Sequence, residues 1–157
     1  MKKFRLAAVL PLAALLMGAD APPAAAPMQL PAQKPGVLHL TLEGLRSEDG
    51  HVRICLWANG QGFPDCKGSD AVERIQAPAA STVTLDVKDL TPGEYGISVI
   101  HDENDNKRLD KSFVGLPFEG VGFSNNASAP FGPPKFEKVQ FTVAEQARQT
   151  IRMRYYL

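Results

Sequence analysis

The sequence predicts an all-β protein: an antiparallel β-sandwich of about seven strands with one long Gly- and Pro-rich loop. Two observations lead to this prediction. Apolar residues alternate with polar ones in short runs along most of the chain, and Pro, Gly, Asn and Asp separate these runs. Alternation with a period of two is typical of half-buried antiparallel strands, which turn-forming residues connect in sandwich domains. The apolar rows of two such sheets would face each other and form the core.

The predicted strands follow this alternation in chain order. Leu38, Leu40 and Leu42 alternate with polar neighbours, and five later runs show the same pattern clearly. These six strands and a weaker seventh are expected at residues 38–43, 52–57, 71–76, 83–87, 95–99, 139–143 and 151–155.

The segment LTPGEY, from Leu90 to Tyr95, joins two of these strands. Pro92 and Gly93 favour a tight turn, so Tyr95 enters the next strand near a corner where sandwich domains often anchor a tyrosine hydroxyl. The element is common in transthyretin-like domains. It places the expected fold in the immunoglobulin-like or transthyretin-like class.

The first 21 residues have the features of a secretory signal peptide. Three basic residues precede an apolar run at 6–17, which is shorter than the ~20 residues needed to span a bilayer, and small residues follow it. Residues 22–35 are rich in Ala and Pro and predict a flexible linker. We therefore expect an exported protein, periplasmic or secreted, whose β-sandwich covers residues 36–157.

Charge restricts the class of partner. Without the signal peptide the chain holds 14 basic and 16 acidic residues and no basic patch, so no nucleic-acid partner is expected. No later apolar segment is long enough to cross a membrane. The expected product is a soluble monomer whose partner is a protein or a small ligand.

The chain has two cysteines, Cys55 and Cys66. In an exported protein such a pair is expected to form a disulfide, which here would close a 12-residue loop. On the chain-entropy model this loop closure is worth roughly 3 kcal/mol of stability. The spacing excludes a CxxC redox pair.

The segment HDENDNKRLD, which begins at His101, has the ligand rhythm of a calcium loop. Hard oxygen donors recur at alternate positions, as calcium requires. The expected ligands are Asp102, Asn104, Asn106, the carbonyl of Arg108, Asp110 and Glu119. Lys107 stands where such a loop turns at glycine, and Phe113 stands at the position of its bidentate Glu, so the expected affinity is weak. The alternative is a polar turn that is held by its own hydrogen bonds, which Asp and Asn form readily.

No periodicity is visible from Lys111 to Pro134, so a long loop is expected there. Loops of this length in compact domains are usually functional or disordered. The aromatic residues of the loop are expected to pin it onto the sandwich. The other interpretation is a shallow recognition surface, formed by His101, Phe123, Asn125, Asn126 and Phe131.

Four linked motifs resemble one known family. They are L-x-P-G-x-Y from Leu90, HDEN-x-N-x-x-LD from His101, G-x-P-x-EG-x-GFSNN from Gly115 and FGPP-x-F from Phe131. Their order resembles the exported family catalogued as domain of unknown function 2141, over about residues 38–155. The resemblance implies a small periplasmic or secreted β-sandwich and carries no enzyme activity. Members commonly have Gly at the position of Lys107, where this chain departs from the pattern.

Three functions compete. The expected one is a non-enzymatic binding or accessory module with the polar loop described above. The second is a hydrolase with His101 as base, Asp102 or Glu119 as orienting or acid group, and Ser124 as nucleophile. Ser124 lacks a G-x-S-x-G elbow, which argues against this assignment. The third is a structural envelope protein that acts through a sheet edge.

Overall fold

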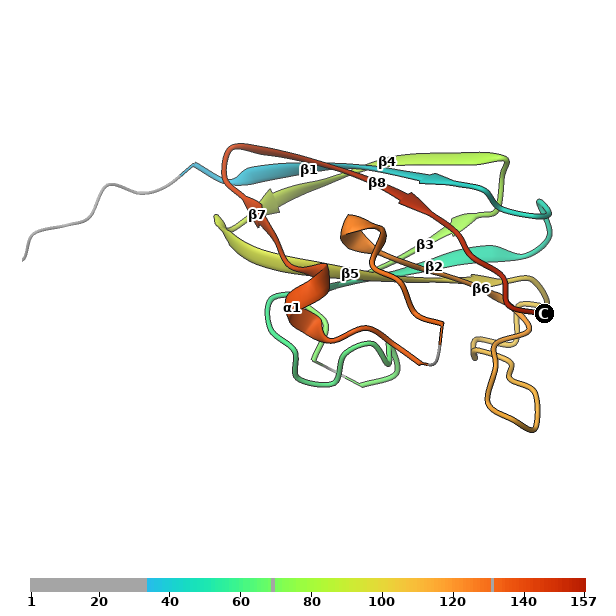
Figure 1. Ribbon diagram of the computed structural model, residues 1–157. Coiled ribbons are helices and arrows are strands. Elements are labelled where there is room, and N and C mark those ends of the chain that lie inside the picture. Colours follow the sequence, from blue (N-terminus) through green and yellow to red (C-terminus); the bar gives the residue numbers. More distant parts are fainter. Residues whose placement is uncertain (1–33, 69, 131) are drawn as a thin grey trace, which may run out of the picture. The chain divides into compact units, whose positions relative to one another are not determined.

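Two β-sheets face each other across the main core (Figure 1). The computed structural model describes residues 34–68, 70–130 and 132–157, which belong to one compact unit. The predicted signal peptide and nearly all of the linker lie outside the described residues. The elements in chain order are β1 (Gly36–Glu43), β2 (His51–Trp57), β3 (Glu73–Pro78), β4 (Thr82–Leu90), β5 (Gly93–Asp102), β6 (Gly120–Phe123), the 3-10 turn η1 (Ser124–Asn126), α1 (Phe136–Val139), β7 (Phe141–Val143) and β8 (Gln146–Arg152).

The strand order is β4-β1-β8 in the first sheet and β3-β2-β5-β6 in the second. Strand β7 also pairs with β5, at Gly93–Tyr95, while β6 pairs with Ser98–His101 of the same strand. All paired strands are antiparallel except β1 and β8, which run parallel because the chain changes sheets between β7 and β8. The predicted all-β sandwich is confirmed, with eight strands among the described residues in place of about seven.

The main core is built from the alternating apolar rows. Leu38, Leu40 and Leu42 of β1 are fully buried, and the residues between them are half-buried. Full burial of one such side chain contributes about 1.5–3 kcal/mol. Tyr95 also belongs to this core, and its hydroxyl donates a hydrogen bond to the carbonyl of Thr91 at 2.7 Å, so the predicted tyrosine corner is confirmed.

The region expected to be one long loop contains a strand, β6. Its apolar alternation is hidden because Gly120 and Gly122 occupy the inward positions. A Cβ atom at Gly120 would lie 2.6 Å from the ring of Tyr155, and one at Gly122 would lie 2.7 Å from Ile151. Glycine therefore lets the chain after β8 approach β6, and Val121 forms a β-bridge with Arg154 there.

Two predicted strand boundaries were wrong near the C-terminus. Val139 ends the short helix α1, and its fully buried side chain packs with Val121 and Phe123 in a small cluster outside the main core. A helical turn and a strand both bury one residue in a run this short, so the alternation could not separate them. The last strand is β8, which ends at Arg152, before Tyr155.

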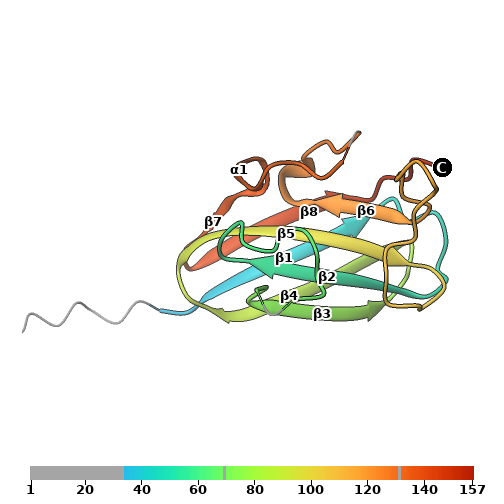
Figure 2. The same ribbon diagram turned by 90° about the horizontal axis from the view of Figure 1, so that it is seen from below.

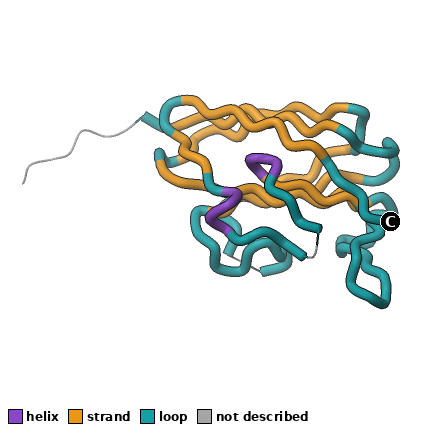
Figure 3. The backbone as a smooth tube through the Cα atoms, in the orientation of Figure 1, coloured by secondary structure: helices purple, strands orange, loops and turns teal. Residues whose placement is uncertain are grey.

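The turn η1 ties the two sheets together at one edge (Figure 3). The buried hydroxyl of Ser124 accepts the N–H of Ile97 in the second sheet and donates to the carbonyl of Val139. The carboxamide of Asn126 donates to the carbonyl of Thr150 and accepts the N–H of Arg152, both on β8. The side chain of Asn126 thus pairs with the outer edge of β8 much as a further strand would.

The outer face of the second sheet is covered by loops. The disulfide loop (residues 58–72) crosses one part of β2 and β5, and the connection from β5 to β6 (residues 103–119) crosses their other end (Figure 2). Cys55 and Cys66 are bonded, with their Cα atoms 6.0 Å apart, so the predicted disulfide is confirmed. The bond fastens the disulfide loop to the outer face of β2.

Candidate functional site

The predicted metal ligands lie in a polar loop (residues 102–110) that closes on its own hydrogen bonds. The carboxylate of Asp102 is 1% exposed and accepts the backbone N–H groups of Asn106 and Lys107, at 3.0 and 2.8 Å. The carboxamide nitrogens of Asn104 and Asn106 both donate to Oδ2 of Asp110, at 2.7 Å. The four side chains are therefore neighbours, and their carboxylate oxygens meet N–H donors.

Glu119 joins the two ends of this loop. Its side chain is 3% exposed and accepts the N–H groups of Glu103 and Asp110, at 3.2 and 3.0 Å. Burial raises the pKa of Glu119, and the negative charges of Asp102 and Asp110 raise it further, while the two backbone hydrogen bonds oppose the rise. Three carboxyl groups thus lie near enough to repel one another.

A calcium site in this loop would require a rearrangement of its amides. Within the described ranges, no three His, Cys, Asp or Glu side chains are arranged to hold a metal ion. The carboxamides of Asn104 and Asn106 would have to turn their oxygens toward Asp110. The N–H of Arg108 donates to Oδ1 of Asn106, while the side chain of Arg108 points to the cavity described below.

The residues of the hydrolase alternative are held by structural partners. His101 is fully buried, and its ring hydrogen-bonds the hydroxyl of Tyr155 at 2.7 Å and the carbonyl of Asp49 at 2.9 Å. The hydroxyl of Ser124 is buried and engaged with backbone groups of β5 and α1. The structure therefore does not pair His101 with Ser124.

The predicted recognition surface does not come together as one surface. His101 and Phe123 are buried. Asn125 and Asn126 are exposed, but their carboxamides bind backbone carbonyls, that of Asn125 reaching Gln140 at 2.7 Å. Phe131 lies outside the described residues.

Sequence-distant segments instead line an open cavity of about 800 Å³ on the outer face of the second sheet. Its floor is apolar and includes Ile100, Val121 and Phe123. Its walls come from the disulfide loop, from residues 107–117, and from the chain on either side of position 131. This volume lies within the range of about 300–1,000 Å³ that is typical of small-molecule sites.

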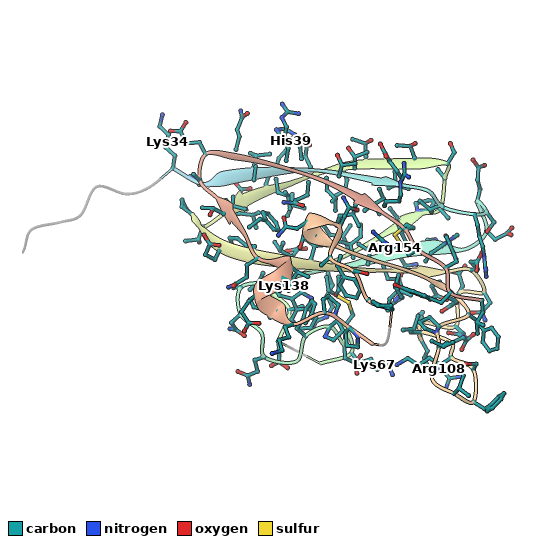
Figure 4. All side chains as sticks on the ribbon, viewed as in Figure 1. Lys34, His39, Lys67, Arg108, Lys138 and Arg154 are labelled. Carbon is teal, nitrogen blue, oxygen red and sulfur yellow. A yellow bond between two sulfur atoms is a disulfide. The ribbon has the colours of Figure 1, made fainter. Side chains whose placement is uncertain are left out.

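Most of the charged residues that line the cavity are basic. Five basic side chains and one carboxylate, that of Asp65, contribute to its lining; the basic residues are Arg53, Lys67, Lys107, Arg108 and Lys111. Within the part of the chain that the structure describes, none of the five forms an ion pair with a carboxylate. Figure 4 shows Lys67 and Arg108 on the outer side of the second sheet, on separate loops. The whole chain has 17 basic and 17 acidic residues, so this local excess of positive charge is not a consequence of composition.

Sequence reasoning missed this cavity because its residues come from six separate places in the chain. One signal was available. Arg53 alternates with Val52 and Ile54, which face the core, so Arg53 had to face outward on the same sheet as the long loop.

The family comparison agrees with the resemblance that the four sequence motifs indicate. The sequence model of a family described as "Uncharacterized protein conserved in bacteria (DUF2141)" matches residues 40–152. The chain belongs to this family. The matched range of DUF2141 contains both sheets and all the strands from β2 to β8, together with the walls of the cavity. The curated proteins and the solved structures give no match to the chain.

The motifs of the DUF2141 chain have structural roles in the described residues. L-x-P-G-x-Y forms the tyrosine corner, the carboxylate of Glu119 closes the polar loop, and GFSNN forms β6 and the turn η1. No helix among the described residues is long and apolar enough to cross a membrane.

Proposed function

We propose that this protein is an exported, non-enzymatic binding module that holds a small amphipathic anion in the loop cavity. One observation carries the proposal: five basic residues and a single acidic residue line a cavity whose floor is apolar. Charge-assisted hydrogen bonds from Arg and Lys would hold an anionic head group. The apolar floor would remove the body of the same ligand from water.

Arg53 is the basic residue best placed to fix the orientation of a ligand in this cavity. It lies on β2, a strand in the middle of the second sheet, and is only half-exposed. Its guanidinium donates one hydrogen bond to the side chain of Gln76 at 3.2 Å, which leaves further N–H groups for a ligand. A head group bound there would place the apolar body against Ile100 and Val121.

The test separates charge from apolar contact. Decanoate, decanol and acetate are titrated into the mature protein, with binding followed by calorimetry and by backbone amide shifts. Decanoate is expected to bind with shifts at cavity residues, decanol more weakly, and acetate hardly at all. Arg53→Gln and Arg108→Gln are each expected to weaken decanoate by about tenfold, since a hydrogen bond to a charged group is worth roughly 1.5–3 kcal/mol.

The matched control is Lys88→Gln, an exposed lysine on β4 of the other sheet. It is expected to leave decanoate affinity unchanged. Equal binding of decanoate and decanol would show that the cations are not a head-group site. Absence of shifts at the cavity with all three probes would overturn the proposed function itself.

A second candidate function is a calcium-stabilised polar loop. The observation that favours it is the crowding of Asp102, Asp110 and buried Glu119, whose mutual repulsion a divalent cation would relieve. The loop has few carboxylates, and Lys107 adds a positive charge. We therefore expect weak binding, with a dissociation constant on the order of 0.1–1 mM.

Thermal melts with calcium, with magnesium and with chelator test this candidate. Calcium at a hundredfold excess over its dissociation constant would stabilise the fold by about 2.7 kcal/mol, and magnesium would do less because it requires strict octahedral geometry. Asp102→Asn should abolish the calcium effect, while Asp89→Asn, near the end of strand β4, should retain it. Identical midpoints in all three buffers would identify the loop as a hydrogen-bonded turn.

A further inference from the structure

A short hairpin arm (residues 110–118) projects from the outer face of the second sheet, beside the cavity (Figure 1). Its two sides are paired, because the N–H of Phe118 donates to the carbonyl of Asp110 at 2.9 Å and that of Ser112 donates to Leu116 at 2.8 Å. Gly115, with a φ of 85°, closes the turn at the tip. The arm is therefore a hydrogen-bonded hairpin, and its pairing fixes the position of the tip relative to its base.

The tip of the arm exposes large apolar side chains. Phe113 is 102% exposed and its neighbour Val114 is 64% exposed. Phe118, at the base, is 49% exposed. Single exposed apolar residues are common on protein surfaces, but a cluster of them on a projecting turn marks an interaction site.

Three exposed basic side chains lie near this apolar tip in the sequence. Lys111 lies on the arm, and Lys107 and Arg108 lie in the loop just before it, all three exposed. The same segment also holds five carboxylates, and each of them is buried or has a hydrogen-bonding or ion-pair partner within the fold. Asp102 and Glu119 are buried, Glu103 is paired with Arg46, Asp105 with His51, and Asp110 accepts two carboxamide donors.

We propose that the tip of the arm inserts into the interface of a lipid membrane with anionic head groups. An aromatic ring on a rigid turn enters the head-group region, and nearby Lys and Arg side chains bind lipid phosphates. Val114 and Lys111 also line the cavity, so membrane contact would bring the cavity mouth to the lipid surface. This inference goes beyond the proposed function and does not depend on what the cavity holds.

Vesicle co-sedimentation of the mature protein tests the inference. Vesicles of phosphatidylcholine alone and vesicles that also contain phosphatidylglycerol are compared at low and high salt. The protein is expected to bind the anionic vesicles, more weakly at high salt. Phe113→Ser should weaken this binding by about tenfold or more, as expected for an aromatic side chain withdrawn from the interface.

The matched control is Val72→Ser, an apolar side chain that is 51% exposed in the disulfide loop. It should bind vesicles as the wild type does. Binding of Phe113→Ser equal to that of the wild type, or no binding of the wild type to either vesicle, would overturn the inference. Self-association that Phe113→Ser abolishes, without vesicle binding, would assign the tip to a second copy of the chain instead. Decanoate titration of Phe113→Ser separates this result from a failure of the cavity, because the ring of Phe113 does not line it.

Discussion

At the residue scale, Arg46 joins segments that are far apart in the sequence. Its guanidinium donates to both carboxylate oxygens of Glu103, to the carbonyl of Phe118 and to the carbonyl of Leu157. It also stacks over the ring of Tyr155, with 4.6 Å between its Cζ atom and the ring centroid. One side chain thus fixes the base of the arm and the end of the chain.

This pairing predicts a pH-dependent stability. The hydrogen bonds from Arg46 lower the pKa of Glu103, so the stabilisation is present above the usual Glu pKa of about 4.3 and is lost as the pH falls through the lowered pKa of the folded state. Glu103→Gln is expected to lower the free energy of unfolding by about 1 kcal/mol at neutral pH, a value discounted because the side chain of Arg46 is 43% exposed. At pH values below the lowered pKa of Glu103 the two proteins should be equally stable.

Urea denaturation at several pH values measures this difference. Glu137→Gln, an exposed position on α1, is the control and should not change the pH profile. A constant difference between Glu103→Gln and the wild type at every pH would show that the charge of Glu103 does not stabilise the fold.

Lys107 illustrates a conflict between conformation and charge. Its φ of 64° lies in the left-handed region, which costs a non-glycine residue roughly 1–2 kcal/mol. Substitution by glycine would remove this cost from the folded state. Part of the gain is offset, because glycine loses more conformational freedom on folding than lysine does. Lys107→Gly is therefore expected to raise the free energy of unfolding by about 0.5–1 kcal/mol and to weaken decanoate binding.

The matched substitution is Lys111→Gly, which lies in the same region at a bridge with Pro117 and outside the left-handed conformation. It should weaken decanoate binding and also lower stability. Equal effects of the two substitutions on chemical denaturation would contradict the conformational argument.

At the element scale, the disulfide loop forms a second small core on the outer face of the second sheet. Cys55, Trp57 and Ala71 are buried there, and Phe63 packs edge-on against Trp57 with 5.8 Å between ring centroids. Pro64 and Lys67 of the same loop line the cavity. The disulfide therefore stabilises the fold and also holds one wall of the cavity.

Removing the disulfide is expected to have two measurable effects. The double variant Cys55→Ala/Cys66→Ala should lose about 3 kcal/mol of unfolding free energy and should bind decanoate more weakly, because the wall that carries Lys67 is released. Denaturation of the oxidised wild type, the reduced wild type and the variant measures the first effect, and calorimetry measures the second. Unchanged decanoate affinity in a folded, disulfide-free protein would mean that the loop is held by its apolar contacts alone.

The sequence predicted the elements whose alternation is complete and missed those whose residues break it. Strands β1, β2 and β5 follow long apolar rows, and the cysteine pair and the tyrosine corner depend on short-range chemistry. Strand β6 was missed because glycines hold its inward positions, and they do so only to let Tyr155 and Ile151 approach. The position of the polar loop could be predicted, since Asp and Asn are typical of turns. The cavity could not be predicted, because it depends on how loops from several strands come together and no local sequence pattern shows this.

At the scale of the whole domain, the two sides of the sandwich differ in how their outer strands are protected. On one side η1 is hydrogen-bonded to β8, and Val121 of β6 forms a bridge with Arg154, which follows β8. On the other side β3 and β4 are the outer strands, and they carry exposed charges at Glu73, Arg74 and Lys88. Charged side chains on outer strands oppose pairing between molecules.

We therefore expect the mature protein to be monomeric in the absence of lipid. Size-exclusion chromatography with light scattering should give the mass of one chain at all concentrations tested, with β-rich circular dichroism. A dimer that persists on dilution would restore the hypothesis of a structural protein that acts through a sheet edge. Reversal of charge at Lys88 would then be expected to change the dimer, which locates the contact on β4.

The two faces of strand β5 have different roles, so substitutions on one face are expected to act differently from those on the other. Ile97 and Val99 face the main core, while Ile100, on the other face of the same strand, contributes to the floor of the cavity. On the proposed function, we therefore expect substitutions at outward positions to alter ligand preference with little effect on folding. A library that varies Arg53, Ile100 and Lys67 while the inward rows stay fixed should yield many folded proteins with different ligand preferences. On the proposed function, the domain would in this sense be a scaffold on which ligand specificity diverges while the fold is retained.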